Sequence, residues 1–225
     1  MNKILSLCLI STLTLFANFF PNTIHTAISK VQNGQIILKH TIQDGTSCAI
    51  VHDYGNNIKA LMHMCRRENG KIELIDIDTI HHDNIPTINT KPKAGDVVIG
   101  GYLYSNILLL APNEKIYKNL TKQYNKKWIH PDLYALFLSQ EGDDEVTKES
   151  LKNFAKRYQI GLIMIVKTNQ IVLFDPYSKH IIATKSYKAD TKKAKYPFYM
   201  HFEELESGWF AKKDGNYYQE MEKIK

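Results

Sequence analysis

The chain has 225 residues, of which 44% are hydrophobic and 23% are charged, a balance typical of a folded globular protein and not of a disordered one. Its formal charge of +6 is mild, and the basic residues do not form an aromatic-interleaved patch, so we expect no nucleic-acid partner.

The first residues have the layout of a secretory signal peptide. Lys3 precedes a mostly apolar run from Ile4 to Phe16, and the small residue Ala17 follows. We expect residues 1–17 to be cleaved, which leaves 28 Lys+Arg against 23 Asp+Glu. The alternative is an uncleaved anchor, although the run is shorter than the about 20 residues that a spanning helix needs. We therefore predict an exported protein, periplasmic or on the cell surface, that is not integral to the membrane after cleavage.

Residues 22–111 contain short β-strand patterns separated by turn signals. Asn33-Gly34 suits a two-residue hairpin turn, because both residue types tolerate positive φ. Further strands are expected near Thr46–Tyr54, Lys59–Arg67, Lys71–Asp76, Val97–Leu103 and Ile107–Ala111. So many short strands predict a small β-barrel or a compact β-sandwich.

The mature chain keeps two cysteines, Cys48 and Cys65. An even pair in an oxidising compartment suggests a disulfide. A loop of Tyr54 to Asn56 places Cys48 opposite Met62, whereas a loop of Gly55 to Ile58 places it opposite Cys65. We predict a disulfide that contributes about 3 kcal/mol, and two buried free thiols are the alternative.

Residues 112–225 are predicted to form an α+β subdomain. Apolar spacing predicts three helices, over Glu114–Tyr124, over Pro131–Ser139 and from Thr147 onward. Three antiparallel strands should follow, over Ile160–Lys167, Gln170–Phe174 and Lys179–Tyr187, and an aromatic strand is expected over Pro197–Phe202. The whole chain is thus predicted to be α+β, with an N-terminal small β-barrel or sandwich followed by a helical-plus-antiparallel-sheet subdomain with aromatic C-terminal strands.

The sequence contains no common catalytic motif, such as G-x-S-x-G, H-E-x-x-H or C-x-x-C. Cys48 and His52 cannot form a catalytic dyad on one strand, because positions four apart on a strand lie about 13 Å apart. Asp53 is one position farther from Cys48, so it is also beyond hydrogen-bond reach of that residue. His81-His82-Asp83 fits a loop better than a metal site, and Asp143-Asp144-Glu145 lacks the alternating oxygens of a calcium loop. We expect no cofactor and no bound metal.

His130 precedes a predicted helix, and we expect it to pack or to cap that helix, not to act as a general base. The prediction of a non-enzymatic protein depends on one expectation, namely that no group of polar side chains comes together to form a catalytic site. A structure that gathers His81, His82 or His130 with acids around an ion or a deep cleft would overturn it.

Several segments together resemble one family. They are Ala49-Ile50-Val51-His52, Lys93-Ala94-Gly95-Asp96, Ile107–Asn113, Ile129–Tyr134, Thr147–Tyr158, Gly161–Val166, Pro197-Phe198-Tyr199 and Tyr217-Tyr218. The family is that of the N-terminal domain of plasminogen-binding protein A, and the resemblance runs from about Thr23 to Tyr218. It implies an exported, non-enzymatic protein, with plasminogen binding attributed to some relatives.

The resemblance also suggests which residues meet a protein partner. Kringle modules of plasminogen capture a lysine, best a C-terminal one, between the charged ends of an aromatic trough. The candidate partner-binding residues are Lys225, Lys223 and the loop residues Lys192, Lys193 and Lys195. The alternative function is a structural or accessory periplasmic component of an envelope machine such as the flagellar motor. It is motivated by a difference from longer relatives, which carry a lysine-rich extension after this domain, whereas the sequence here stops at the edge of the domain.

Overall fold

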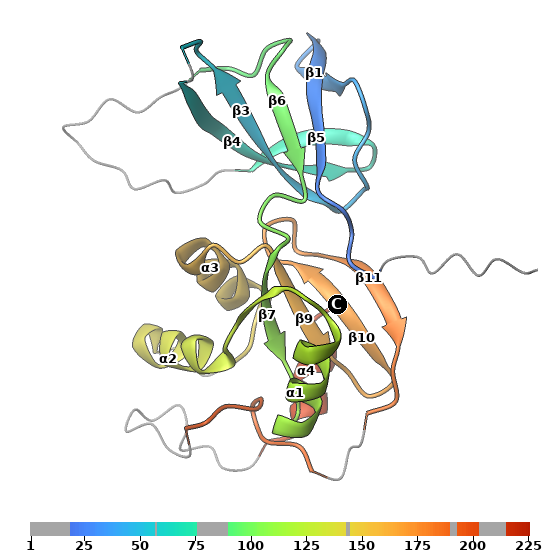
Figure 1. Cartoon of the computed structure of the whole chain (residues 1–225), viewed down its shortest axis with the longest axis vertical. Helices are drawn as coiled ribbons and strands as arrows, with labels where there is room; N and C mark the ends of the chain where they lie inside the picture. Colours follow the sequence, from blue (N-terminus) through green and yellow to red (C-terminus); the bar gives the residue numbers. More distant parts are fainter. Residues whose placement is uncertain (1–18, 57, 76–89, 143–144, 190–192, 203–214) are drawn as a thin grey trace, which may run out of the picture.

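A computed structural model of the chain describes residues 19–56, 58–75, 90–142, 145–189, 193–202 and 215–225. These residues form a closed β-barrel and, beside it, a five-stranded sheet with helices (Figure 1). The predicted signal peptide lies outside the described residues, as do His81-His82-Asp83 and Asp143-Asp144.

The barrel closes in the order β1-β2-β5-β4-β3-β6, with β6 hydrogen-bonded to β1. Its strands are β1 (Ile24–Gln32), β2 (Gln35–Leu38), β3 (Ser47–Asp53), β4 (Lys59–Glu68), β5 (Lys71–Ile75) and β6 (Val97–Gly100). The predicted hairpin is confirmed, since Asn33 and Gly34 both have positive φ and Gln32 pairs with Gln35. The barrel interior is filled by Ile28, Ile42, Cys48, Ile50, Cys65 and Val98.

Cys48 lies opposite Cys65 on the neighbouring strand, with the two sulfur atoms 2.17 Å apart. The structure reaches this register by a route that neither predicted loop provides. Asp53, not Tyr54, pairs with Lys59, and this register alone would place Cys48 opposite Met64. A β-bulge between Ile50 and Val51 shifts the pairing by one residue and brings the cysteines together.

The second sheet has the order β11-β10-β9-β7-β8. Its strands are β7 (Asn106–Leu110), β8 (Lys127–Ile129), β9 (Leu162–Val166), β10 (Gln170–Asp175) and β11 (His180–Ser186). The antiparallel run β9-β10-β11 agrees with the sequence prediction.

Strand β7 differs from the prediction, because residues 107–111 were assigned to the β-rich N-terminal half. The structure places β7 inside the second sheet, parallel to both β8 and β9. Residues 107–110 are fully buried, which suits a parallel strand covered on both faces better than a barrel strand with one exposed face.

The helices are α1 (Glu114–Gln123), α2 (Pro131–Glu141), α3 (Lys148–Tyr158) and α4 (Tyr217–Glu222). The first three lie where apolar spacing predicted them. Asn113 caps α1, and Thr147 and Ser150 form a capping box at α3, so each start is stabilised by its own sequence.

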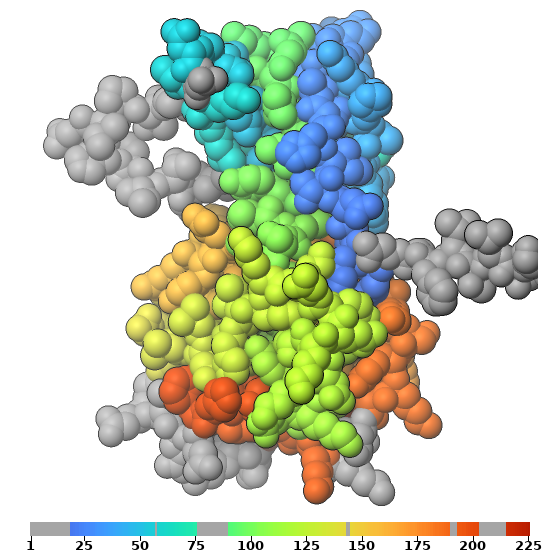
Figure 2. Space-filling model, viewed as in Figure 1, coloured from blue at the N-terminus to red at the C-terminus, as the bar shows by residue number. Residues whose placement is uncertain are grey.

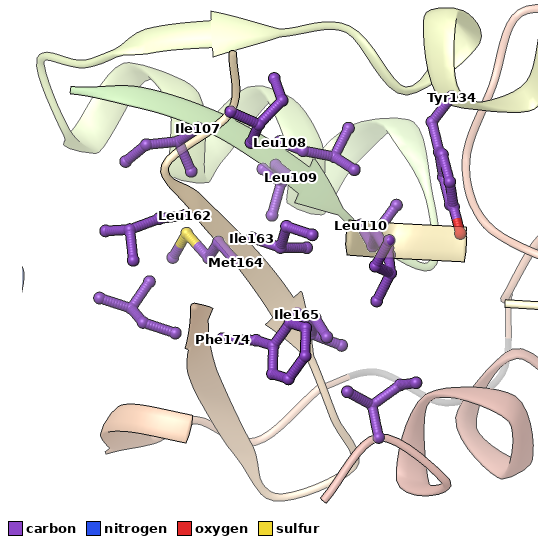
Figure 3. Packing of buried hydrophobic residues seen from close by; sticks show 14 of the residues in the cluster. Ile107, Leu108, Leu109, Leu110, Tyr134, Leu162, Ile163, Met164, Ile165 and Phe174 are labelled. Carbon is purple, nitrogen blue, oxygen red and sulfur yellow. The ribbon is translucent and has the colours of Figure 1, made fainter. Parts of the chain in front are cut away.

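The larger core packs the second sheet against the helices. Figure 3 shows the aliphatic side chains of β7 and β9 meeting Phe174, with Tyr134 from α2 at the same core. The Tyr134 ring stacks with Phe137 and Phe198 and is tilted against Phe154, and its hydroxyl lies 2.8 Å from Ser150 Oγ. This aromatic cluster accounts for the buried side of α2, whereas Leu133 and Leu136 on its other side are exposed.

The aromatic C-terminal strands that the sequence predicted are wrong for the described residues. Residues 197–202 form an irregular segment in which 197–200 are all buried, so no alternation of inward and outward side chains exists. The segment runs along the end of β7, where Tyr199 N donates to Ala111 O at 2.8 Å. Tyr217 and Tyr218 begin α4, which Asn216 caps.

The barrel and the second sheet are joined through Asp175, a fully buried carboxylate at the end of β10. Its Oδ2 accepts from Ser47 N of the barrel at 2.8 Å and from the Tyr104 hydroxyl at 2.5 Å, while its Oδ1 accepts from the backbone amides of Tyr177 and Ser178. Burial raises the pKa of Asp175, although these hydrogen bonds oppose the shift.

Candidate functional site

The lysines predicted to meet a partner differ in how the fold engages them. Lys195 donates through Nζ to Met200 O at 2.8 Å and to Phe202 O at 2.9 Å, and Lys223 pairs with Glu220 at 2.9 Å. Lys192 lies outside the described residues. Lys193 and Lys225 are exposed and form no ion pair with another described residue. Among the described candidates, these two have ammonium groups that are available.

The chain segment that leads to Lys225 is anchored. Ile224 is 2% exposed, and its carbonyl accepts from Nζ of the buried Lys167 at 2.7 Å. Lys225 thus follows directly on a residue held in the core.

No nucleophile and base are brought together around Cys48, His52 and Asp53. Cys48 faces Cys65, and Asp53 accepts from Gly55 N. His52 Nδ1 instead lies 2.5 Å from Asp96 Oδ1, and both side chains are buried. Asp96 also accepts from Lys93 N, so it ties a turn to β3. Two of the segments that carried the family resemblance meet in this contact, with a structural role.

A hollow of about 500 Å³ lies along β2 and β5 on the barrel. Arg67 lines it, but its guanidinium already donates to Thr41 Oγ1 and Ile42 O and pairs with Asp44 at 3.0 Å. The charge of Arg67 is therefore used within the fold.

His130 is the N-cap of α2, as predicted: its Nδ1 accepts from Asp132 N at 3.2 Å. Pro131 occupies the first turn, where its missing N–H has no partner to lose. These three consecutive residues place an imidazole and a carboxylate on one rigid helical turn.

A second imidazole joins them from a distant part of the chain. His201 Nδ1 lies 2.9 Å from Asp132 Oδ2, and His130 Nδ1 lies 3.2 Å from the same oxygen. One ligand atom from each of the three side chains lies within 4.8 Å of the other two. We call His130, Asp132 and His201 the imidazole–carboxylate cluster.

Aromatic rings surround the imidazole–carboxylate cluster. The imidazoles of His130 and His201 stack with centroids 4.5 Å apart and planes 9° apart, and Tyr117 meets His130 edge to face. Tyr199 Oη lies 3.0 Å from His201 Nε2. Figure 2 shows residues 193–202, in orange-red, on the surface beside α1 and α2.

The electrostatics follow from this packing. Burial lowers the pKa of His130, and the neighbouring His201 adds to the shift, while Asp132 opposes it. Burial would raise the pKa of Asp132, but hydrogen bonds from the backbone and side chain of His201 outweigh it, so this pKa is lowered. Burial also raises the pKa of Tyr117 to about 12.

Sequence reasoning found only part of this arrangement. It placed His130 at the helix start, but it assigned His201 to a strand and predicted no metal-binding residues. No local signal could pair residues 69 positions apart, as Asp132 and His201 are. The crossing of residues 193–202 over the start of α2 brings them together.

No helix in the described part of the chain is long and apolar enough to cross a membrane.

The fold and the sites define an α+β protein in which a closed six-stranded barrel is joined to a mixed sheet, with lysines and an imidazole–carboxylate cluster on its surface. The family described as plasminogen-binding protein pgbA N-terminal matches residues 23–223, and the chain belongs to this family. This membership confirms the resemblance noted in the sequence.

One curated relative is the plasminogen-binding protein PgbA of Helicobacter pylori, which is 26% identical over 139 residues. The match covers 60% of this chain and 30% of the relative, so the chain spans about a third of the relative's length. No solved structure is significantly similar to this chain.

Proposed function

We propose that this chain is an exported, non-enzymatic binding protein whose partner is plasminogen. The observation that carries the proposal is the family match over residues 23–223, which spans both the barrel and the second sheet. The relative from Helicobacter pylori is named for the same binding.

Exposed lysine side chains would form the contact with plasminogen. Kringle modules bind a lysine by pairing its ammonium group with acidic residues and packing its methylenes on aromatic rings. Lys225 and Lys193 suit this role best, because both are exposed and form no ion pair with another described residue. Lys195 and Lys223 would first have to leave their present partners.

Surface plasmon resonance with immobilised plasminogen tests the proposal. We expect saturable binding by the mature chain, competition by free 6-aminohexanoic acid, and a severalfold loss of affinity when Lys225 is removed. Lys223→Ala is the matched control, since its ammonium group is already paired with Glu220, and it should bind as the wild type does. Unchanged binding without Lys225 would refute the role of this residue, and no binding at all would refute the function.

Localisation gives an independent test, because a protein that binds host plasminogen must reach the cell surface. Protease treatment of intact cells should degrade the protein. Degradation only after the outer membrane is permeabilised would contradict the proposal and favour a structural role within the envelope.

A further inference from the structure

We infer that His130, Asp132 and His201 form a binding site for one divalent first-row transition-metal ion, of which Zn²⁺ is the representative. The inference is independent of plasminogen binding, because it depends only on the geometry and chemistry of these three side chains. An ion bound here would, however, meet the condition stated above for overturning the non-enzymatic prediction, because it would gather His130 with an acid around a metal.

The spacing of the ligand atoms suits a single ion. A tetrahedral Zn²⁺ with bonds of about 2.05 Å holds its ligand atoms about 3.35 Å apart. Asp132 Oδ2 lies 3.2 Å from His130 Nδ1 and 2.9 Å from His201 Nδ1. The ligand atoms of the two imidazoles lie within 4.8 Å of each other, which is up to about 1.45 Å more than the tetrahedral spacing, so a tilt of one ring must close the difference. His201 can supply that tilt, because its side chain is 63% exposed.

The ligand types select the class of ion. Two imidazole nitrogens and one carboxylate oxygen suit Zn²⁺ and its neighbours, whereas Ca²⁺ and Mg²⁺ require sets of oxygen ligands. The three ligands leave at least one coordination position open. Because His201 is largely exposed, that position faces solvent, where a water molecule or a partner's side chain can fill it.

The backbone already holds the ligands in place. His130 and Asp132 flank Pro131 at the start of α2, and His201 N donates to Asp132 Oδ1 at 2.8 Å. That hydrogen bond leaves Oδ2 to act as the ligand atom. Outer partners that orient ligands in this way are a regular feature of metal sites.

Tyr199 plays a matching role for His201. When Nδ1 binds an ion, Nε2 carries the ring proton, and the Tyr199 hydroxyl oxygen lies 3.0 Å away as its acceptor. A hydrogen bond at the second nitrogen fixes the tautomer and the ring orientation of a ligating histidine.

The ion displaces two interactions. The 2.9 Å hydrogen bond between His201 Nδ1 and Asp132 Oδ2 is replaced by a bond from each of these atoms to the ion, and the second interaction is weak. His130 Nδ1 now accepts from Asp132 N at 3.2 Å, at the long end of the range for such a bond. The same nitrogen lies 3.2 Å from Asp132 Oδ2, and a lone pair cannot bond favourably to a carboxylate oxygen. A cation between these two atoms turns an unfavourable approach into two bonds.

Isothermal titration of the mature, untagged chain with Zn²⁺ tests the site. We expect one Zn²⁺ per chain and a rise in Tm with Zn²⁺. His201→Ala, Asp132→Asn and His130→Asn should each weaken binding at least tenfold, because even an outer partner is worth about 10- to 100-fold in affinity. Asn at position 130 keeps a capping oxygen, so α2 should still form. Tyr199→Phe should weaken binding about tenfold while retaining one ion per chain.

Two control variants distinguish this site from other histidines. His180→Ala removes an imidazole that lies 2.6 Å from Glu68 but has no third ligand among the described residues, and it should leave Zn²⁺ affinity unchanged. The double variant His81→Ala/His82→Ala should do the same. The proposal is overturned if the folded wild type binds no Zn²⁺ saturably, if His201→Ala binds as tightly as the wild type, or if a control variant alone abolishes binding.

Discussion

Asp175 should contribute more to stability than any exposed ion pair of the described residues, and Asp175→Ala is the change that tests this. The carboxylate is fully buried and accepts four hydrogen bonds, two of which reach Ser47 in the barrel and Tyr104 in the connection to β7. Alanine removes every acceptor at once. The donors that remain are themselves buried, so water cannot replace the lost partner.

The magnitude follows from the number of donors. A buried donor without a partner costs about 1–3 kcal/mol, and if at least two of the four stay unpaired the loss is about 2–6 kcal/mol. Since a whole domain is stable by about 5–15 kcal/mol, this is a large fraction. Asp175→Asn should cost less, about 1–3 kcal/mol, because its carbonyl still serves Tyr177 and Ser178 while its NH₂ group faces Ser47 N.

Urea denaturation followed by circular dichroism measures these losses. Tyr104→Phe is the matched control, because it removes one donor and leaves the carboxylate with three amide partners, and it should cost about 1–2 kcal/mol. A loss below about 0.5 kcal/mol for Asp175→Ala, a size typical of surface substitutions, would refute the argument.

The same carboxyl predicts a pH dependence. Because burial raises the pKa of Asp175 above its ordinary value of 3.8, the folded state keeps the proton at a pH where the unfolded chain has lost it. Its favourable contribution is therefore fully present below 3.8 and is lost as the pH rises through the raised pKa. The free energy of unfolding of the wild type relative to Asp175→Asn should fall over this interval. A difference that rises with pH would contradict the sign.

Two further predictions concern the Cys48–Cys65 pair of the barrel and the close contact between Gly161 and the backbone of Leu103. Replacing Cys48 and Cys65 by serine should cost about 3 kcal/mol for a loop of this length, and reductant should lower the Tm of the wild type but not of the variant. Two reactive thiols in the denatured, non-reduced mature protein would exclude the disulfide. Gly161→Ala should destabilise by about 3 kcal/mol or more, because its Cβ would overlap the backbone of Leu103. Gly142→Ala has open space at a φ of 70° and should cost only about 1 kcal/mol, so equal losses in the two variants would disprove the clash.

The local elements were predictable because their signals lie within a few residues of one another. Asn33-Gly34 supplies the two positive φ angles of the first hairpin, and Asn69-Gly70 supplies them between β4 and β5. Thr147 caps α3 through a residue three positions later. The family resemblance was visible for a related reason, since it is carried by short segments.

The site and the connections between the elements were not predictable in the same way. Residues 107–111 have the apolar run of a strand, but apolarity does not say which sheet a strand joins. Pro197–Phe202 has high β-propensity, yet burial of its consecutive side chains against α2 and the end of β7 overrides that preference. Met62 is the extra residue of the β-bulge that brings Cys48 opposite Cys65, and the sequence analysis did not predict this bulge.

By itself the sequence determined where the turns, the helix starts and most strands lie, because each depends on dihedral preferences and hydrogen bonds between near neighbours. The tertiary structure alone decided that His201 reaches Asp132 and that Asp175 bonds to Ser47, pairs separated by 69 and 128 positions. Such contacts arise when packed surfaces bury distant segments together, and a buried polar group must then find whatever partner the packing offers.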